Sequence, residues 1–337
     1  MRALLICAGG GIGDSLMASM CANALHRKYE TVDALTLPAH ADTLQHVPDF
    51  DEVLVDDGAS ISDLSKMLAE RTYDSAVVTW ATRRTAVLPT RARIPVRVGQ
   101  ANRLYSALFT HRVPVLSEYG DVITHWSQIL LDFARALGCD SDLPHPRFVI
   151  GPDDREEAGD LLARRKIEEP FGIVHPTCSI SSQRDQWPIE GWIALVRALQ
   201  EYCEFPMVLS GATADAVSNA KIAAATGAIS IAGECGIGAF AALAQEARFI
   251  AVMHSGPMHV AAAVGTPTIG IFPLQADFPD RWAPLGERVR VVRASFRCPP
   301  GERMETCPDY RCVRALPVTR IVAAVGGLRL RAGEKVA

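Results

Sequence analysis

A carboxylate at the end of a glycine-rich turn is the first feature of this sequence with a chemical use. The amino-terminal apolar run leads into Gly9-Gly10-Gly11-Ile12-Gly13-Asp14, and a helix is expected to begin there. Glycines such as Gly11 and Gly13 let a backbone approach a ligand closely, and unpaired N–H groups at a helix start attract anions. Asp14 is then either a cap of the helix or a general base that takes a proton from a substrate hydroxyl.

The same turn argues against the most obvious rival, a nicotinamide dinucleotide site. The fingerprint of such sites is G-x-G-x-x-G between a strand and a helix. A register that starts at Gly9 needs a glycine at Asp14, and the other registers fail at Ile12 or Leu16. In addition, Asp33 stands at the start rather than the end of the second expected strand. A Rossmann-type oxidoreductase is therefore disfavoured.

A second segment has the pattern of an anion site. An apolar run that ends at Val252 leads to Ser255-Gly256-Pro257-Met258-His259, in which a Ser-Gly turn precedes a helix expected from Pro257. Backbone amides in the first turn of such a helix point toward a ligand. His259 either contacts a phosphate or a sugar hydroxyl, or is a structural side chain. The five residues Ser255, Gly256, Pro257, Met258 and His259 are therefore the candidates for binding a phosphorylated donor.

A loop in the second half of the chain supplies a cation. After a strand expected at 171–175, this loop carries Arg184-Asp185-Gln186-Trp187-Pro188, and the next helix is expected near Pro188. Arg184 is the only strong cation in the loop, and a diphosphate needs one to offset its charge. Trp187 is interpreted as a core aromatic residue. Arg184 therefore joins the candidate donor-binding residues.

Three cysteines form a cluster near the carboxyl terminus, with the spacing Cys298-x8-Cys307-x4-Cys312. Zinc prefers four ligands, and the spacing lacks the C-x2-C pair that makes such signals strong. Structural thiols are the favoured interpretation, and a metal site with a fourth ligand or a disulfide remains an alternative. The sequence therefore predicts no metal and no cofactor.

The elements that position these residues alternate between strands and helices. In the first half, strands are expected at 2–8, 32–37, 52–55, 74–79 and 94–98, with helices at 14–28, 40–46, 61–70 and 123–137. The same alternation restarts at Phe171, after a proline-containing connection. Such a pattern predicts parallel sheets with helices on both faces. We expect an α/β protein with two doubly wound domains, residues 1–155 and 156–330, whose ligands bind beyond the carboxyl ends of the strands in a central cleft between the domains.

Composition narrows the class of protein further. The chain has 337 residues and a formal charge of −4, which argues against nucleic-acid binding. A local basic group, Arg83, Arg84, Arg91, Arg93 and Arg97, is either a site for an anionic ligand or a solvated face. No apolar run approaches the ~18 residues that a membrane-spanning helix needs. The chain has nine cysteines, an odd number, and most of them are scattered through apolar stretches, which suits reduced thiols and a cytoplasmic location.

Taken together, these motifs resemble the ADP-heptose:lipopolysaccharide heptosyltransferases, glycosyltransferase family 9. The resemblance rests on the Gly11-Ile12-Gly13-Asp14 turn, Trp187-Pro188, Gly233, the run from Ser255 to Pro267, and Arg281-Trp282 with Pro284. It implies the GT-B architecture of two Rossmann-like domains and a metal-independent, inverting transfer of heptose from ADP-heptose to a lipopolysaccharide-type glycan or glycolipid acceptor. It also implies that Asp14 is the general base on the acceptor side, that the Ser255–His259 loop holds the donor diphosphate, and that the protein is cytoplasmic with peripheral contact at the inner membrane face.

Two positions depart from the pattern of that family. Where the family usually carries a lysine for the donor phosphates this chain has Asp185, and where it opens the donor loop with an aspartate this chain has His254. A carboxylate near a diphosphate is repulsive unless a cation intervenes. A protein of the same fold that binds a nucleotide sugar without transferring it is therefore the alternative function.

Overall fold

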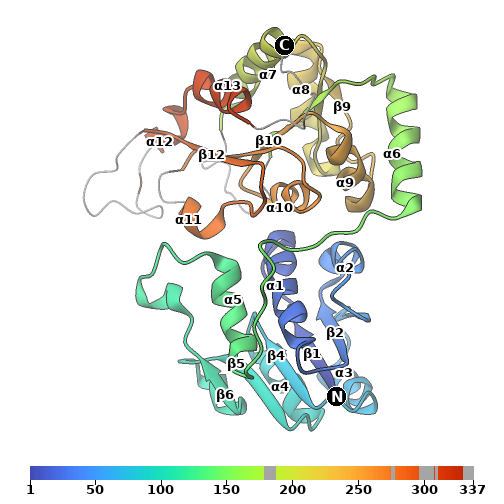
Figure 1. The fold of residues 1–337 in the computed structure, drawn as a ribbon, viewed down its shortest axis with the longest axis vertical. Coiled ribbons are helices and arrows are strands. Elements are labelled where there is room, and N and C mark those ends of the chain that lie inside the picture. Colours follow the sequence, from blue (N-terminus) through green and yellow to red (C-terminus); the bar gives the residue numbers. More distant parts are fainter. Residues whose placement is uncertain (178–186, 275–277, 296–306, 308–309, 329–337) are drawn as a thin grey trace. The chain divides into compact units, whose positions relative to one another are not determined.

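The structure is a computed structural model, and it describes residues 1–177, 187–274, 278–295, 307 and 310–328. The chain divides into two compact units, Met1–Val149 and Ile150–Ala337, and each is described by itself (Figure 1). Within the described residues, no helix combines the length and the apolar character needed to cross a bilayer.

The first unit contains a sheet of six parallel strands in the order β3-β2-β1-β4-β5-β6. The strands are β1 (Arg2–Ile6), β2 (Thr31–Thr36), β3 (Val53–Val55), β4 (Ser75–Val78), β5 (Val96–Gln100) and β6 (His111–Val113). The central strands are apolar along their whole length because helices cover both faces of a parallel sheet. Residues 4 to 6 and 76 to 78, for example, have no exposed surface.

Five helices and two short 3-10 turns complete the first unit. They are α1 (Ile12–Leu25), α2 (Pro38–Gln45), α3 (Ile61–Glu70), α4 (Arg83–Arg91), α5 (Trp126–Arg135), η1 (Leu104–Leu108) and η2 (Leu116–Tyr119). Helix α1 packs against α2 and α5, and α3 packs against α4. Figure 1 shows α5 beside α1.

The second unit repeats the plan, with six parallel strands in the order β12-β11-β10-β7-β8-β9. These strands are β7 (Gly172–His175), β8 (Met207–Leu209), β9 (Ile229–Ser230), β10 (Ile250–Met253), β11 (Thr268–Phe272) and β12 (Val289–Arg293). Numbered within its own unit, each sheet has the order 3-2-1-4-5-6. In this order, ligands bind where the strand order reverses, at the carboxyl ends of the first and fourth strands.

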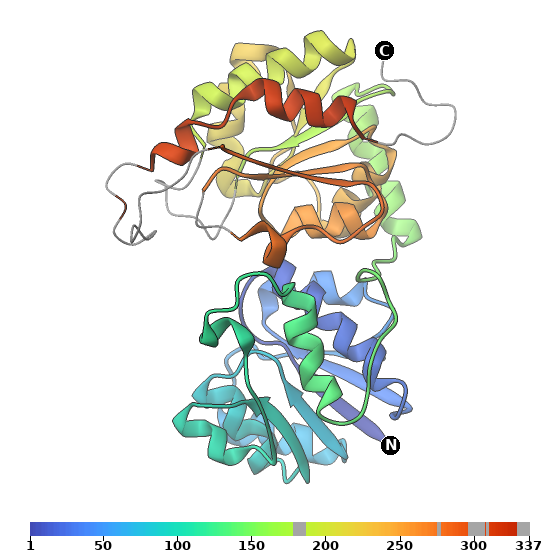
Figure 2. The same cartoon turned by 60° about the vertical axis from the view of Figure 1, so that its left-hand side comes forward.

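The helical elements of the second unit are α6 (Pro152–Arg165), α7 (Ile189–Cys203), η3 (Thr213–Asp215), α8 (Ala216–Thr226), α9 (Ile237–Glu246), α10 (Gly256–Ala263), α11 (Pro279–Trp282), α12 (Arg311–Arg314) and α13 (Val318–Gly326). Helix α13, red in Figure 2, packs on α7 and on strands β11 and β12. Trp187 is 5 % exposed and packs edge-to-face on Trp192, with their ring centroids 5.0 Å apart. Its interpretation as a core aromatic residue is confirmed.

The predicted α/β class with two doubly wound sheets is confirmed, while several elements were missed. No helix was predicted for residues 80–93, yet α4 begins after Thr82. The hydroxyl of Thr82 accepts a hydrogen bond from Thr85 N at 3.2 Å. No helix was predicted between the proline-containing connection and Phe171, but Pro152–Arg165 is helix α6. The strands β6 and β12 and the helix α13 were not predicted either. Predicted boundaries elsewhere differ from the observed ones by a few residues at most.

A buried polar group lies at the amino ends of β1 and β2. Asp33 has no exposed surface, and its Oδ2 atom accepts from Arg2 Nη2 at 2.9 Å and from Tyr73 Oη at 2.6 Å. A buried carboxylate is tolerated only when such donors satisfy it. These contacts join β2, which carries Asp33, to Arg2 of β1 and to Tyr73, two residues before β4, at this edge of the sheet.

We expect Tyr73→Phe to lower the free energy of unfolding by about 1–3 kcal/mol, because it removes a donor from a buried charged acceptor and leaves the ring in place. Urea unfolding measures the change. Tyr202→Phe is the matched control, because Tyr202 on α7 is 40 % exposed. Equal losses in the two variants would show that the contact to Asp33 contributes nothing specific.

Candidate functional site

The turn after β1 brings the Asp14 carboxyl group back onto its own backbone. Asp14 is the third residue of α1, and its Oδ2 atom accepts from Gly11 N at 2.7 Å. Gly10 has φ +70°, and a Cβ on it would lie 2.5 Å from this oxygen. Gly11, by contrast, has an extended backbone with φ −108° that other residues adopt, and Gly13 lies in the first turn of α1. Gly10 is therefore a position in this turn where the structure requires a glycine.

Asp14 borders a small cavity of about 10 Å³ at the carboxyl edge of the first sheet, roughly the room of one water molecule. Its lining comprises Cys7, Gly9, Asp14, Ser15, Thr79, Trp80, Trp126 and Leu130. A Cβ on Gly9 would lie 2.0 Å from Trp80 Cδ1, so glycine is also required for the indole to approach this turn. The cavity thus joins the loops after β1 and β4, the first and fourth strands of the unit.

The surroundings of Asp14 favour a protonatable carboxyl group. The residue is partly exposed, but its Oδ1 atom is buried. Burial raises the pKa of Asp14 above its ordinary value, while the Gly11 amide, a hydrogen bond from the Trp126 side chain and the nearby His40 oppose the rise. A raised pKa in a cavity is the usual property of a carboxylate that exchanges protons with a substrate.

Two residues beside Asp14 were not singled out in the sequence. His40 on α2 is 6 % exposed, and its Nδ1 atom lies 3.1 Å from the hydroxyl of Ser15, which follows Asp14. Burial lowers the pKa of His40, and the negative charge of Asp14 works in the opposite direction. Little in the sequence predicts this contact. The only indication is a helix that starts at Pro38, shortly after the buried strand β2.

A comparison within the chain separates capping from other roles of Asp14. Asp154 stands at the same place in α6, and its Oδ2 atom accepts from Gly151 N at 2.7 Å. Asp215 accepts in the same way from Ala212 N at 2.8 Å. Capping alone therefore explains an aspartate at this helix position. The cavity that Asp14 borders distinguishes it from these two residues.

A larger groove of about 280 Å³ adjoins the cavity and shares Trp80 and Trp126 with it. The two indoles lie edge-to-face with their centroids 6.4 Å apart. Gln100 Nε2 and Arg103 Nη2 both donate to Glu118 Oε1, which holds this carboxylate at the groove. Aromatic faces next to a few oriented polar groups form a typical small-molecule site. This arrangement can accept a polyhydroxylated ring, and the sequence analysis did not identify it.

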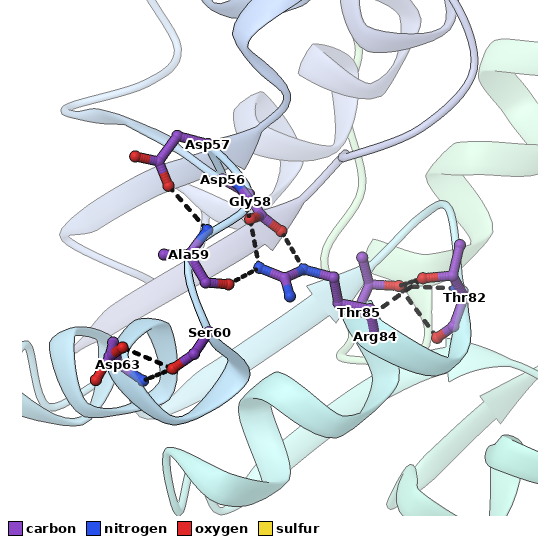
Figure 3. A network of polar contacts seen from close by, with 9 residues as sticks. All are labelled: Asp56, Asp57, Gly58, Ala59, Ser60, Asp63, Thr82, Arg84 and Thr85. Carbon is purple, nitrogen blue, oxygen red and sulfur yellow. Dashed lines mark hydrogen bonds and ion pairs between the residues drawn. The ribbon is translucent and has the colours of Figure 1, made fainter.

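Part of the basic group noted in the sequence serves the fold itself. Figure 3 shows Arg84 donating from Nε and Nη2 to the two carboxyl oxygens of Asp56, at 2.7 and 2.6 Å. The guanidinium of Arg84 holds the pKa of Asp56 below its usual value. Arg97 donates to the carbonyl oxygens of Leu108 and Ile94 at 2.8 and 2.7 Å. These two arginines therefore fix loops rather than face a ligand, whereas Arg83, Arg91 and Arg93 are exposed.

In the second unit, the predicted donor loop follows β10, the fourth strand of its sheet in chain order. Ser255 is the N-cap of α10, and its hydroxyl donates back to Met253 O at 3.0 Å instead of capping the first-turn amides. Gly256 and Pro257 form the partly exposed first turn. Met258 and His259 are 1 % and 8 % exposed, so they pack inward. The helix start has the geometry of an anion site at the backbone of Gly256.

The end of β7, the first strand of that unit in chain order, carries a neutral histidine. His175 is 7 % exposed, and its Nδ1 atom lies 3.0 Å from Ser210 Oγ. Burial lowers the pKa of His175 to about 4, so the ring is uncharged at neutral pH. Arg184, the predicted cation, and Asp185 lie outside the described residues.

The cysteine cluster is described only in part. Cys312 is buried in the core of the second unit and Cys307 is partly buried, whereas Cys298 lies outside the described residues. Among residues 1–177, 187–274, 278–295, 307 and 310–328, no three His, Cys, Asp or Glu side chains are arranged to hold a metal ion.

Solved structures with the same fold include two heptosyltransferases and another protein of glycosyl transferase family 9. The E. coli ADP-heptose LPS heptosyltransferase II is 20% identical, with a TM-score of 0.78 over 97% of this chain and 98% of that one. A glycosyl transferase family 9 protein from Veillonella parvula is 17% identical, with a TM-score of 0.74 over 86% and 85% of the two chains. The E. coli heptosyltransferase WaaC with ADP is 16% identical, with a TM-score of 0.71 over 95% and 98%. These likenesses confirm the GT-B architecture expected from the sequence. No curated protein sequence matches the chain.

The family assignment rests on the sequence itself. The model of glycosyltransferase family 9 (heptosyltransferase) matches residues 61–309, which is well over half of the chain. The chain therefore belongs to glycosyltransferase family 9, as its motifs and its two Rossmann-like units had indicated.

Proposed function

We propose that this glycosyltransferase moves a heptose from ADP-heptose to a lipopolysaccharide-type glycan acceptor, with inversion at the transferred carbon. The observation that carries the proposal is the Asp14 carboxyl group, which has a burial-raised pKa and borders a cavity in a chain of family 9. An E. coli neighbour of the same fold is described with ADP-2-deoxy-2-fluoro heptose, which supports this class of donor.

In the proposed reaction, Asp14 is the general base. The acceptor hydroxyl transfers its proton to a carboxyl oxygen of Asp14 while the hydroxyl oxygen forms a bond to the anomeric carbon of the donor. The bond between that carbon and the diphosphate breaks on the opposite face, and the nucleoside diphosphate leaves. Inversion requires a base on the acceptor side and stabilisation of charge on the leaving diphosphate.

The second unit is the proposed site for the donor. The first turn of α10 provides backbone N–H of Gly256 and the positive end of a helix dipole. The neutral ring of His175 at the end of β7 adds no charge there. The assignment of Arg184 as the cation for the diphosphate remains a prediction from the sequence. The acceptor is proposed to bind in the groove lined by Trp80, Arg103 and Glu118, in a cytoplasmic enzyme that works at the inner membrane face.

A thermal-shift screen with ADP-, GDP-, UDP- and TDP-sugars tests the donor. A ligand present at 100 times its dissociation constant stabilises the fold by about 2.7 kcal/mol. We expect ADP-heptose to raise the melting temperature most, and the other nucleotides to raise it less at equal concentration. A larger shift with another nucleotide sugar would contradict the proposed donor. Stabilisation without any transfer to a glycan acceptor would favour the non-catalytic alternative.

We expect Asp14→Asn to lower kcat by about 10²–10⁴-fold with a nearly unchanged KM for the donor, because the amide caps the helix but cannot take a proton. In the native enzyme, kcat should fall on acidification through a pKa above that of an ordinary aspartate, since only the ionised form is a base. Asp154→Asn is the matched control with the same capping contact. An Asp14→Asn enzyme with more than a tenth of the native kcat would exclude Asp14 as the base.

The Asp14→Asn variant also tests how much stability the protein loses by burying the charge of Asp14. The pKa of Asp14 is higher in the folded than in the unfolded chain, so the folded state binds more protons between these two values. Stability from this group is therefore lost as pH rises through that window. The melting temperature of Asp14→Asn relative to native protein should rise from acidic to neutral pH. Parallel curves for the native protein and Asp14→Asn would refute the burial argument.

A further inference from the structure

Large apolar side chains stay exposed in one stretch of the first unit. Leu104 is fully exposed, and Ile123, Tyr119 and Val122 are 70 %, 61 % and 38 % exposed. Single exposed apolar residues are common, whereas several that lie together usually mark a surface that contacts something else. All four lie in the loops that follow β5 and β6.

Polar contacts hold these loops side by side. Arg103, directly before Leu104, pairs with Glu118, and Asn102 Nδ2 donates to the hydroxyl of Tyr119. Asp121 Oδ1 then accepts from Ile123 N at 3.2 Å, which fixes the chain beyond η2. In Figures 1 and 2 the segment between β6 and α5 extends away from the strands as a separate loop. The four apolar residues therefore belong to one surface.

The charge of this region is opposite to that of the chain. Residues 80–125 contain seven arginines and two acidic residues, a net charge of about +5, whereas the whole chain carries −4. Arg84 is paired with Asp56, but Arg83 and Arg112 are exposed and have no acidic partner among the described residues. Arg83 lies near η1, because Tyr105 Oη donates to Ala81 O at 2.6 Å. Arg112 lies on the edge strand that leads into η2.

We propose that Leu104, Tyr119, Val122 and Ile123, with Arg83 and Arg112, form a docking surface for an anionic phospholipid bilayer. Apolar side chains that enter the interface and arginines that pair with anionic headgroups are the two contributions that hold a protein on such a membrane. Charge complementarity selects a lipid surface over an uncharged apolar partner.

The docking surface adjoins the groove proposed for the acceptor. Arg103 and Tyr105 line that groove from η1, and Glu118 lines it from η2, the same turns that carry Leu104 and Tyr119. A glycolipid anchored in the bilayer would then present its sugar at the groove entrance. This last step rests on the proposed function, whereas the docking itself does not.

Co-sedimentation with vesicles tests the surface on the full-length protein. We expect binding to phosphatidylcholine vesicles that contain phosphatidylglycerol, weaker binding to phosphatidylcholine alone, and weaker binding at high salt. The double variant Leu104→Ser/Ile123→Ser should bind about tenfold more weakly, because each side chain loses apolar burial. Arg83→Ser/Arg112→Ser should also lose about tenfold, since each basic residue contributes near an anionic surface. Val217→Ser is the control, because Val217 on α8 is 69 % exposed in the other unit.

The outcomes separate docking from its alternatives. Native protein that stays in solution, or a Leu104→Ser/Ile123→Ser variant that binds like native protein, overturns the proposal. Light scattering is measured in parallel, and an assembly that the same variant dissociates would identify the surface as a subunit interface instead. Melting temperatures equal to that of native protein show that the variants are folded. The vesicles carry neither donor nor acceptor, so a failure of sugar transfer leaves this result unaffected.

Discussion

The candidate site of the first unit depends on the absence of two side chains. A Cβ on Gly10 would lie against the Asp14 carboxyl group, and a Cβ on Gly9 would lie inside the indole of Trp80. Because both glycines leave this space open, the carboxyl group can return to Gly11 N while the indole covers the turn. The position and the burial of Asp14 follow from this packing, and so does the pKa that burial raises. The chemistry proposed for the enzyme therefore starts from the backbone conformation of one turn.

The periodic parts of the fold could be predicted from the sequence, because their signal is local. Helix 61–70 matches α3 at both ends, since an apolar stripe lies between a Ser60 cap and the polar turn that follows. Helix α4 was missed because Pro89 lies inside it and its start depends on the Thr82 and Thr85 side chains. The alternation of strands and helices was enough to predict the class of fold, because parallel strands need helical crossovers whatever their individual boundaries.

The site was predictable only where it is contiguous in the sequence. Asp14 follows its glycines directly, and the donor loop is a single run of residues. His40 meets Ser15 across 25 positions of the chain, and Arg103 meets Glu118 across 15. Such contacts arise from the order of strands in the sheet, which brings the loops after distant strands to one edge. No local pattern in the sequence encodes them.

Each unit forms its own sheet with the same strand order, and each collects its candidate residues after the first and fourth strands. In the first unit, the Arg84–Asp56 pair ties the start of α4 to the loop after β3, independently of the groove-lining residues that follow (Figure 3). Substitutions at exposed positions in the turns at 100–123, such as Leu104 and Tyr119, therefore leave the buried core of the first unit unchanged. If the acceptor binds to the first unit and the donor to the second, as proposed, the preference for an acceptor can diverge within the family while the preference for a donor is retained. Likeness in the carboxyl-terminal half of two members would then be a poor guide to whether they modify the same glycan.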